Sequence, residues 1–415
     1  MPATKLYAFL LLVISLLSLT GCWSMRETDE IAYVLAVGFD KGEKDNLVLT
    51  LSIANPRTAT GGGGGGGGEE TTREIVSVET IGPLAMLDLL NTAIDRRIYL
   101  QHAKAFIFSE DLAREGIGRW LSALMRFREI RGNSEVFICR GKARDLIQKT
   151  SPFLELSPAK QFELIRKMSE IHGLYPTTQL IDLYLDTKSH AKQAVLPLAA
   201  IHEGEFELAK PGHERGLGEY LAGEVPVAGK SKVQFTGTAV FREDKLVGLL
   251  DGQDTRYFLM LTGHFGSGYM GIKDPLDGSG DIGLRVRQGQ KPKYRTGIDE
   301  DGNVAIDVEL FLEPEITASY SANDFERTDL KPILEEAFSK QTEQGCHNLI
   351  KRTQDELRAD IFGFGEKVKR KFLTVQTWEE YKWLERYPEA QVNVSVRSQI
   401  RRTGLLMKTI PTRQE

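Results

Sequence analysis

A cysteine at position 22 has the most specific chemical setting in this sequence. It follows Leu19, Thr20 and Gly21 at the end of an apolar run that starts at Leu6. This order is typical of a bacterial lipoprotein signal, in which a diacylglycerol is attached to the thiol beside the scissile bond. We therefore predict that cleavage leaves Cys22 as the first residue, carrying an S-linked diacylglycerol and an N-acyl chain such as palmitate. Two acyl chains attach a protein firmly to a membrane, whereas one gives marginal binding.

The segment before Cys22 has the length of a signal peptide. A short start with one charge, Lys5, leads into the apolar run, which is shorter than the roughly 20 apolar residues needed to span a bilayer core. The alternative is an ordinary secretory signal or an uncleaved anchor beside a chance cysteine. We expect residues 1–21 to be a signal peptide and the remainder to be a body tethered to the outer face of a membrane.

Other residue types that perform chemistry lack the spacing that they need. The seven histidines include no pair four positions apart, which excludes an H-E-x-x-H zinc site, and no G-x-S-x-G nucleophile elbow occurs. His102 precedes a strand, and a structural role is expected for it. Cys139 and Cys346 form no C-x-x-C pair, and we interpret them as separate buried thiols, with one disulfide as the alternative. We predict no catalytic residues, no metal site and no cofactor beyond the lipid on Cys22.

Eight consecutive glycines, Gly61–Gly68, do not have the context of a phosphate-binding loop. Such a loop lies directly between a strand and a helix and ends in Lys followed by Ser or Thr. Here Pro56 separates the run from the preceding strand, and Glu69 and Glu70 follow it. Because these carboxylates would repel a phosphate, we predict a mobile surface loop over residues 57–72.

Length and charge limit the classes of protein to which the chain can belong. The formal net charge is −5, and loss of Lys5 with the signal peptide makes it −6. A mildly acidic chain lacks the basic footprint of most nucleic-acid-binding proteins, so we predict no nucleic-acid partner. The 415 residues suffice for two or three domains. We expect an N-terminal α/β region at 22–202, a middle region at 203–290 and a C-terminal α/β domain at 291–412.

The pattern of elements predicts a mixed α/β (α+β) fold. Runs rich in Val, Ile and Leu around polar turns predict hairpins at 31–55 and 233–251. Alternation of apolar and polar residues predicts half-buried strands at 303–314 and 391–402, and the Gly- and Asp-rich stretch 263–303 predicts short strands. Helical spacing is found at 81–97, 110–127, 141–149, 158–171, 177–187, 330–359 and 377–387, and further strands are expected at 103–109, 134–140 and 193–201.

Candidate surfaces for partner contact lie at both ends of the chain. Trp23, Arg26 and Glu27 come directly after the lipidated cysteine, and a Trp is well suited to a membrane interface. Arg401 and Arg402 end the last predicted strand. They are either solvated or placed to contact lipid headgroups or an acidic partner.

The stretch DIFGFGEKVKRKF, residues 360–372, joins a turn of aromatic residues and glycines to a basic helical segment. Phe362 and Phe364 are candidates for an interface. The alternative is a helix break, in which Gly363 and Gly365 allow the bend and both rings pack inward.

Taken together, these clusters resemble the Ger(x)C family of spore germination proteins, the C subunits of nutrient germinant receptors. The resemblance starts with GCWSMRETDEIAYVLAVGFDKGE, residues 21–43, although Ser24 stands where the family often has Asp, and Thr28–Asp29 stands where it has an apolar–Asn pair. It continues through RRIYLQHAKAFIFSEDLAREGI at 96–117. It ends with DIFGFGE at 360–366 and IRRTGL at 400–405.

The resemblance implies a lipoprotein without catalytic activity on the outer face of the spore inner membrane. Its implied partners are the A subunit and the transporter-like B subunit of the receptor, besides membrane lipid through Cys22. The implied fold is an elongated body of three mixed α/β domains. The implied function is to assemble with the membrane-embedded subunits and support them during germination. A lipid-tethered solute-binding protein that captures a nutrient is the alternative.

Overall fold

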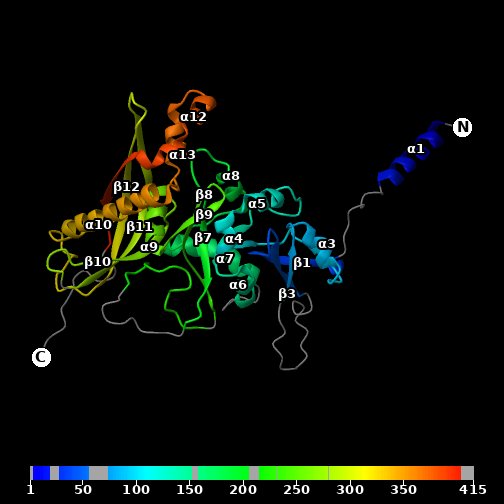
Figure 1. Cartoon of the computed structure of the whole chain (residues 1–415), viewed down its shortest axis with the longest axis horizontal. Coiled ribbons are helices and arrows are strands. Elements are labelled where there is room, and N and C mark those ends of the chain that lie inside the picture. The colour runs from blue at the N-terminus through cyan, green and yellow to red at the C-terminus, as the bar shows by residue number, and fades with distance from the viewer. Residues whose placement is uncertain are drawn as a thin grey trace.

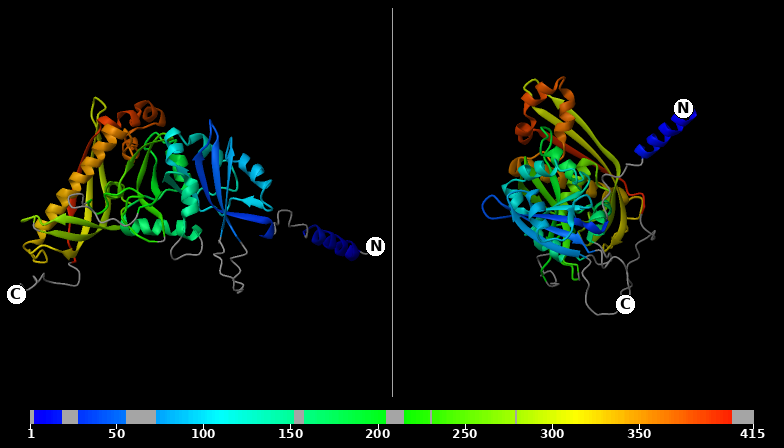
Figure 2. Two further views of the ribbon diagram at one scale, coloured as in Figure 1. Left: turned by 60° about the horizontal axis from the view of Figure 1, so that its bottom comes forward. Right: turned by 90° about the vertical axis from the view of Figure 1, so that its right-hand side faces the viewer.

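The chain folds into a mixed α/β body built around two β-sheets (Figure 1). The computed structural model describes residues 3–18, 28–55, 73–151, 158–204, 215–229, 231–278 and 280–402. Cys22, Trp23, Arg26 and Glu27 and the predicted loop 57–72 lie outside these ranges. The elongated body has the first sheet toward the N-terminal end and the second sheet at the other end (Figures 1 and 2). The prediction of a mixed α/β, elongated, multi-domain fold is confirmed, and the number of three domains stays a prediction.

The apolar N-terminal run forms helix α1 (Ala3–Ser18), which is 16 residues long. Among the residues that the structure describes, no helix has both the length and the apolar character required to cross a membrane. The short 3-10 turn η1 (Thr28–Glu30) leads from the following segment into the first strand.

The first sheet has parallel strands at its centre and antiparallel strands at both edges. Its order is β3 (Arg73–Thr80), β2 (Leu47–Ala54), β1 (Ile31–Lys41), β5 (Ala105–Ser109), β6 (Glu135–Arg140), β7 (Val195–Ile201), β8 (Val233–Arg242) and β9 (Lys245–Leu250), with β4 (Arg97–Tyr99) beside β1. The four central strands β1, β5, β6 and β7 run parallel. Parallel strands are covered on both faces, which explains why every residue of β5 is buried.

Helices cover both faces of this sheet. One face packs against α3 (Ala85–Asn91), α4 (Glu110–Glu115), α5 (Gly118–Leu124) and α8 (Leu180–Asp186). The other face packs against α6 (Ala143–Lys149) and α7 (Pro158–His172). The hairpins predicted at 31–55 and 233–251 are present as β1–β2 and β8–β9.

The prediction of one continuous helix over 110–127 is wrong, because two helices, α4 and α5, occupy that stretch. Gly116 ends α4 with φ of 124°, a conformation that residues with a side chain rarely adopt. The β8–β9 turn reaches into the break, where the amide of Ile117 donates to the Asp244 carbonyl oxygen at 3.0 Å and that of Gly118 to Asp244 Oδ2 at 3.1 Å. The helix predicted over 81–97 is likewise shortened to α3.

The second sheet has four strands and is covered by long helices. Its order is β10 (Ser267–Lys273), β11 (Asp281–Ile298), β12 (Val304–Ser319) and β13 (Gln391–Ser398). Its core includes side chains of α9 (Gly252–Thr262) and α10 (Lys331–Arg352). The predicted alternation is confirmed, since Val304, Ile306 and Val308 are buried whereas Asp307 is exposed.

The connection from α10 back to β13 consists of short helical pieces. They are the π-helical turn η2 (Thr353–Leu357), α11 (Phe364–Val368), η3 (Lys369–Lys371), α12 (Val375–Tyr381), α13 (Trp383–Arg386) and η4 (Tyr387–Glu389). The helix predicted over 330–359 therefore ends early, and Arg358 adopts a left-handed φ of 49° directly after the π turn. Helix α12 projects from the upper end of the body in Figure 1, beside the β11–β12 hairpin.

The short strands expected over 263–303 are replaced by one short and one very long strand. β11 continues for 18 residues through Gly289 and Pro292, residues that suggested turns. The pairing between β11 and β12 shifts register on both sides of Gln290. The strand therefore continues through Gly289 and Pro292 with local irregularities in its pairing. The predicted middle region, 203–290, contributes β8 and β9 to the first sheet and β10 with the start of β11 to the second.

Candidate functional site at the junction of the two sheets

The DIFGFGE stretch forms a tight turn around one carboxylate, and we call residues 360–366 the junction turn. The Asp360 side chain is buried and accepts five hydrogen bonds. Oδ1 accepts from the backbone amides of Phe362, Gly363 and Phe364 at 3.0, 3.0 and 3.3 Å. Oδ2 accepts from the amide of Gly365 at 2.9 Å and from Trp383 Nε1 at 2.8 Å. One carboxylate thus sets the backbone path of the whole motif.

Burial raises the pKa of Asp360 to about 6, because removal from water disfavours the ionised form. The hydrogen bonds from the Gly365 amide, the Trp383 ring and the other turn amides act in the opposite direction. At neutral pH the group is therefore ionised, with its charge held by oriented N–H dipoles. Such oriented amides are an effective way to hold a buried negative charge.

The glycines of the junction turn are required by geometry. Gly363 has a left-handed φ of 70°. A Cβ on Gly365 would lie 2.3 Å from the Ala191 carbonyl oxygen and 2.3 Å from Trp383 Cδ1. The backbone of the turn therefore lies directly against the segment that precedes β7 in the first sheet.

The interface role predicted for Phe362 and Phe364 is corrected by the structure. The two side chains are 6% and 0% exposed, and their rings stack with centroids 5.0 Å apart. The Phe364 ring also contacts Tyr294 and Tyr387. Both rings pack inward, which is the alternative arrangement considered for this stretch. The turn around the Asp360 carboxylate directs them into the core.

Backbone and side-chain contacts join the junction turn to the first sheet. The amide of Gln193 donates to the Asp360 carbonyl oxygen at 2.7 Å, and Gln193 Oε1 accepts from the amide of Glu243 in the β8–β9 turn at 2.6 Å. Lys192 Nζ lies 2.9 Å from Asp186 Oδ1 in α8 and 3.8 Å from Glu366 Oε1. Residues 192–193 therefore connect α8, the β8–β9 turn and the junction turn, three segments that are distant from one another in sequence.

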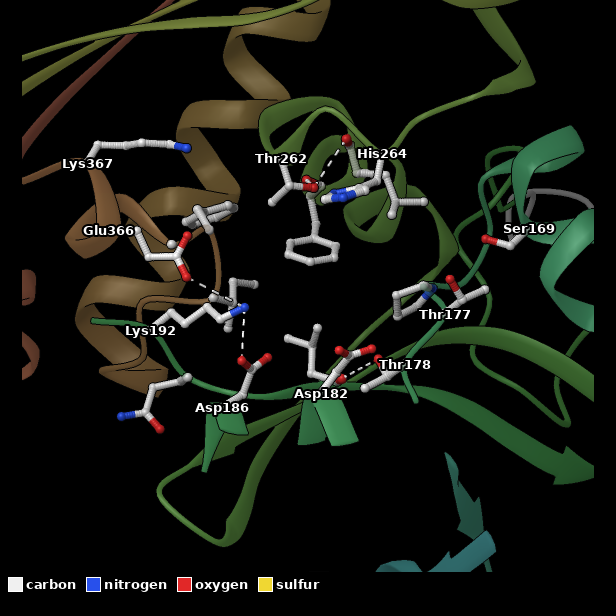
Figure 3. Close-up of a pocket in the computed structure, with 18 of the residues that line it drawn as sticks. Ser169, Thr177, Thr178, Asp182, Asp186, Lys192, Thr262, His264, Glu366 and Lys367 are labelled. Carbon is white, nitrogen blue, oxygen red and sulfur yellow. Dashed lines mark hydrogen bonds and ion pairs between the residues drawn. The ribbon is translucent and has the colours of Figure 1, made fainter. Parts of the chain in front are cut away.

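A pocket of about 540 Å³ lies at this junction (Figure 3). Its lining comes from α7, α8, the segment before β7, α9, β11 and the junction turn. Figure 3 shows Lys192 between Asp186 and Glu366, with Lys367 at the upper left of the view and His264 at the upper right, beside Thr262. The Lys367 ammonium lies 4.9 Å from the centroid of the Tyr294 ring. Charges of both signs therefore surround one concave site.

The electrostatics of the pocket follow from partial burial. Burial raises the pKa of Asp186, with Lys192 opposing that shift. Burial acts to lower the pKa of Lys192, but the carboxylates of Asp186 and Glu366 outweigh it and raise the pKa. Burial, together with the positive charges of Lys192 and Lys291, lowers the pKa of His264 and so favours its neutral imidazole. Such an arrangement is suited to binding a small polar molecule that carries one positive and one negative charge.

The structure does not bring the other predicted surface residues to this pocket. Arg401 is exposed, and its Nε lies 3.1 Å from Glu313 Oε1 on β12. Arg402 pairs with Glu315 through the backbone only, as an isolated parallel β-bridge. Neither arginine lines the pocket. Within the described ranges, no group of three or more His, Cys, Asp or Glu side chains is placed to hold a metal ion.

The remaining thiols and His102 have structural surroundings. Cys139 and Cys346 are free and buried, the first in β6 and the second in α10, which agrees with the interpretation as separate thiols. His102 packs edge-on against the Tyr33 ring with centroids 5.1 Å apart, as expected for a structural residue.

Sequence reasoning missed the central residues of the junction, namely Asp360, Lys192 and Trp383. The signal available for Asp360 was local, since an Asp followed by alternating aromatic residues and glycines can accept hydrogen bonds from the amides of its own turn. No comparable signal existed for Lys192 or Trp383, because their partners lie far away in the chain.

Comparison with known proteins gives matches along most of the chain. Residues 24–201 match the family described as "Spore germination protein N-terminal domain". Residues 236–404 match the family described as "Spore germination B3/ GerAC like, C-terminal".

Relatives from Bacillus subtilis (strain 168) align with almost the whole chain. The chain is 25% identical over 409 residues to "Putative spore germination protein YfkR", with 98% of each chain covered. It is 25% identical over 418 residues to "Spore germination protein KC", with 95% of each chain covered. The crystal structure of the GerBC protein matches with a TM-score of 0.53 at 15% identity, over 88% of this chain and 97% of that one, and therefore supports a shared fold.

Proposed function

The chain belongs to the Ger(x)C family of spore germination proteins, and we propose that it is a lipid-anchored accessory subunit of a nutrient germinant receptor. The observation that carries the proposal is the match of both family domains, in order, over residues 24–201 and 236–404. The relatives named KC and B3 are spore germination proteins, which supports a role of this chain in germination. Assembly with the membrane subunits, the lipid anchor and the location at the spore membrane are parts of this proposal.

In this proposal the partners are the A and B subunits, and the location is the outer face of the spore inner membrane. The acyl chains on Cys22 confine the body to the membrane plane, which raises its effective concentration for membrane-embedded partners. The chain performs no catalysis. It acts as a scaffold, in which the junction turn holds the two sheets in a fixed relation and so presents one continuous surface to the partners.

The experiment is purification of a tagged chain from detergent-solubilised spore membranes, with co-purifying proteins identified by mass spectrometry. Recovery of both membrane subunits in amounts comparable to the tagged chain supports the proposal. Recovery of the chain alone, still acylated at Cys22, contradicts the proposed assembly while leaving the lipid anchor in place.

The pocket favours a second candidate, a lipid-tethered solute-binding protein. Its volume of about 540 Å³ is sufficient for a small nutrient, and its charges of both signs suit a zwitterionic or polyhydroxylated molecule. Titration calorimetry of the purified chain with amino acids and sugars tests this candidate. A heat of binding that Glu366→Gln weakens, and that Glu356→Gln on the exposed side of η2 leaves unchanged, supports it; absence of any heat contradicts it.

A further inference from the structure

An exposed segment that is both basic and apolar follows the junction turn, and we call residues 369–375 the basic tip. It starts with three consecutive exposed cations, Lys369, Arg370 and Lys371, which form η3. Leu373 is 101% exposed and Val375 is 62% exposed. Among the described residues, no ion pair joins any of the three cations to a carboxylate. The positive charge of the tip is therefore available to a partner.

The exposure of Leu373 is imposed by its neighbours. The Phe372 ring packs inward against Trp378 and Tyr381, with centroid distances of 5.3 and 4.9 Å. On the other side, Thr374 begins α12 and its Oγ1 accepts from the amide of Thr377 at 3.2 Å. Because Phe372 is partly buried on one side and Thr374 caps α12 on the other, the Leu373 side chain points outward.

The position of the basic tip allows it to contact a flat surface. It ends at Val375, the first residue of α12, and α12 projects from the upper end of the body in Figure 1. The Tyr381 hydroxyl at the end of α12 donates to the Gly302 carbonyl oxygen at 2.8 Å, which fastens α12 to the tip of the β11–β12 hairpin. The exposed side chains are thus carried by an ordered extremity of the molecule.

Charge and shape together favour an anionic lipid surface as the partner. Acidic side chains occur nearby, in Glu379 and Glu380 of α12 and in residues 299–301 of the hairpin, but the three cations are contiguous and directly beside Leu373. A protein partner normally requires an interface of about 800 Å² per side with a contiguous apolar core. Two separate aliphatic side chains flanked by cations instead match the pattern of interfacial membrane contacts.

We propose that the basic tip rests on the anionic surface of the membrane, with Leu373 inserted among the lipid headgroups and Lys369, Arg370 and Lys371 against their phosphates. The proposal rests on the proposed lipid anchor, which supplies the same membrane. An anchor at Cys22 alone leaves the body free to rotate about its tether. A second contact through the tip fixes the orientation of the two sheets relative to the membrane.

The test uses the full acylated chain reconstituted on vesicles of equal parts phosphatidylglycerol and phosphatidylcholine. Leu373→Cys is labelled with a polarity-sensitive thiol dye, and brominated lipids serve as quenchers. Because Cys139 and Cys346 are buried, the dye reacts selectively at the new thiol. The matched control is Leu276→Cys, which is 47% exposed in the β10–β11 turn.

We expect lipid quenching of the dye at position 373 to exceed that at 276 by about twofold or more, with a blue shift of its emission. We expect this difference in quenching between the two positions to disappear on vesicles of phosphatidylcholine alone. We expect the same when Lys369, Arg370 and Lys371 are all changed to Glu. Equal quenching at both positions, with the chain still floating with the vesicles, overturns the tip contact but leaves the anchor intact. A chain that does not float overturns both. Protection of position 373 only after membrane subunits are added identifies a protein partner and overturns the proposal.

Discussion

At the scale of single residues, the buried carboxylate of Asp360 has the greatest consequences for the structure. Its two oxygens accept all five hydrogen bonds described above, four of them from the backbone of its own turn. Hydrogen bonds to an ionised acceptor are about twice as strong as those between neutral groups. Loss of the acceptor leaves buried amides unsatisfied, which is more costly than loss of the bonds alone.

We predict that Asp360→Asn lowers the free energy of unfolding by about 2 to 4 kcal/mol at neutral pH. The side-chain amide keeps one accepting oxygen but places an NH₂ group against the amide of Gly365 and the indole N–H. Urea unfolding followed by circular dichroism measures the change. Asp355→Asn is the control, because Asp355 is exposed on η2. Equal stability of the two variants would show that the carboxylate does not organise the turn.

A second residue-scale prediction concerns His172, at the end of α7. Burial, together with the positive charge of Arg256, lowers the pKa of His172 to about 4, and Nδ1 accepts a hydrogen bond from the amide of Leu174 at 3.0 Å. In the unfolded chain the imidazole gains its proton near pH 6.5, whereas in the folded chain it does so only near pH 4. The contribution of this group to stability is therefore fully present above about pH 6.5 and is lost as the pH falls toward about 4.

We expect His172→Asn to flatten this part of the stability profile, since the Asn Oδ1 can accept from the Leu174 amide without titrating. The parent chain should lose on the order of 1 kcal/mol more than the variant between about pH 7 and about pH 5. Denaturant unfolding at both pH values gives the difference. An equal change in the free energy of unfolding between the two pH values, in parent and variant, would contradict the assignment of a neutral imidazole to folded His172.

At the scale of elements, close backbone contacts decide where the predicted helices end and how the junction is formed. The turn of β8–β9 occupies the break between α4 and α5, and the junction turn lies against residue 191. In both places a glycine permits the approach. The two contacts lie close to each other, because Gln193, two residues after Ala191, accepts a hydrogen bond from the amide of Glu243 in the β8–β9 turn.

Gly365→Ala is predicted to destabilise the chain by about 1 to 3 kcal/mol, because the added methyl group overlaps a carbonyl oxygen and the Trp383 ring. Thermal unfolding measures the loss, and intrinsic tryptophan fluorescence reports displacement of Trp383. The matched control is Gly271→Ala on the exposed face of β10, where a Cβ meets nothing within 4 Å. A loss no larger than that of the control would mean that the turn moves freely away from residue 191.

At the scale of the whole molecule, the body and its membrane tether are separate features. The body is ordered through its two sheets and their shared junction, whereas the tether is predicted from sequence alone. The match to two family domains over 24–201 and 236–404 confirms the resemblance to the Ger(x)C family. The proposed function requires both features, because a scaffold acts on membrane subunits only while it stays beside them.

Cys22→Ala is predicted to lower the membrane-bound fraction of the chain by about tenfold or more, since all the acyl chains carried by Cys22 are lost. Germination in response to nutrients should weaken accordingly. Quantitative immunoblots of spore membrane and soluble fractions, with germination followed by the fall in optical density, provide the measurement. Normal germination with a fully detached chain would contradict the requirement for anchoring, and Cys139→Ala serves as the control for loss of a thiol.

The sequence by itself determined the features that depend on near neighbours. The apolar run and Leu-Thr-Gly-Cys order predicted the lipid signal, alternation predicted β12 and β13, and the ordered motifs indicated the family. Period and motif are properties of a few consecutive residues, so they can be recognised without knowledge of the fold. The limits of β11 were missed for the same reason, because residues typical of turns were accommodated by its pairing with β12.

Only the tertiary structure decided which side of the junction turn faces the core and which side chains remain outside. DIFGFGE is compatible with an exposed aromatic surface as well as with a buried turn. Contacts with Ala191, Gln193 and Trp383 select the buried form. The pocket likewise combines residues from 166 to 367, and the exposure of Leu373 depends on the rings that hold Phe372. These features arise from packing between distant segments, and no local pattern specifies which segments will meet.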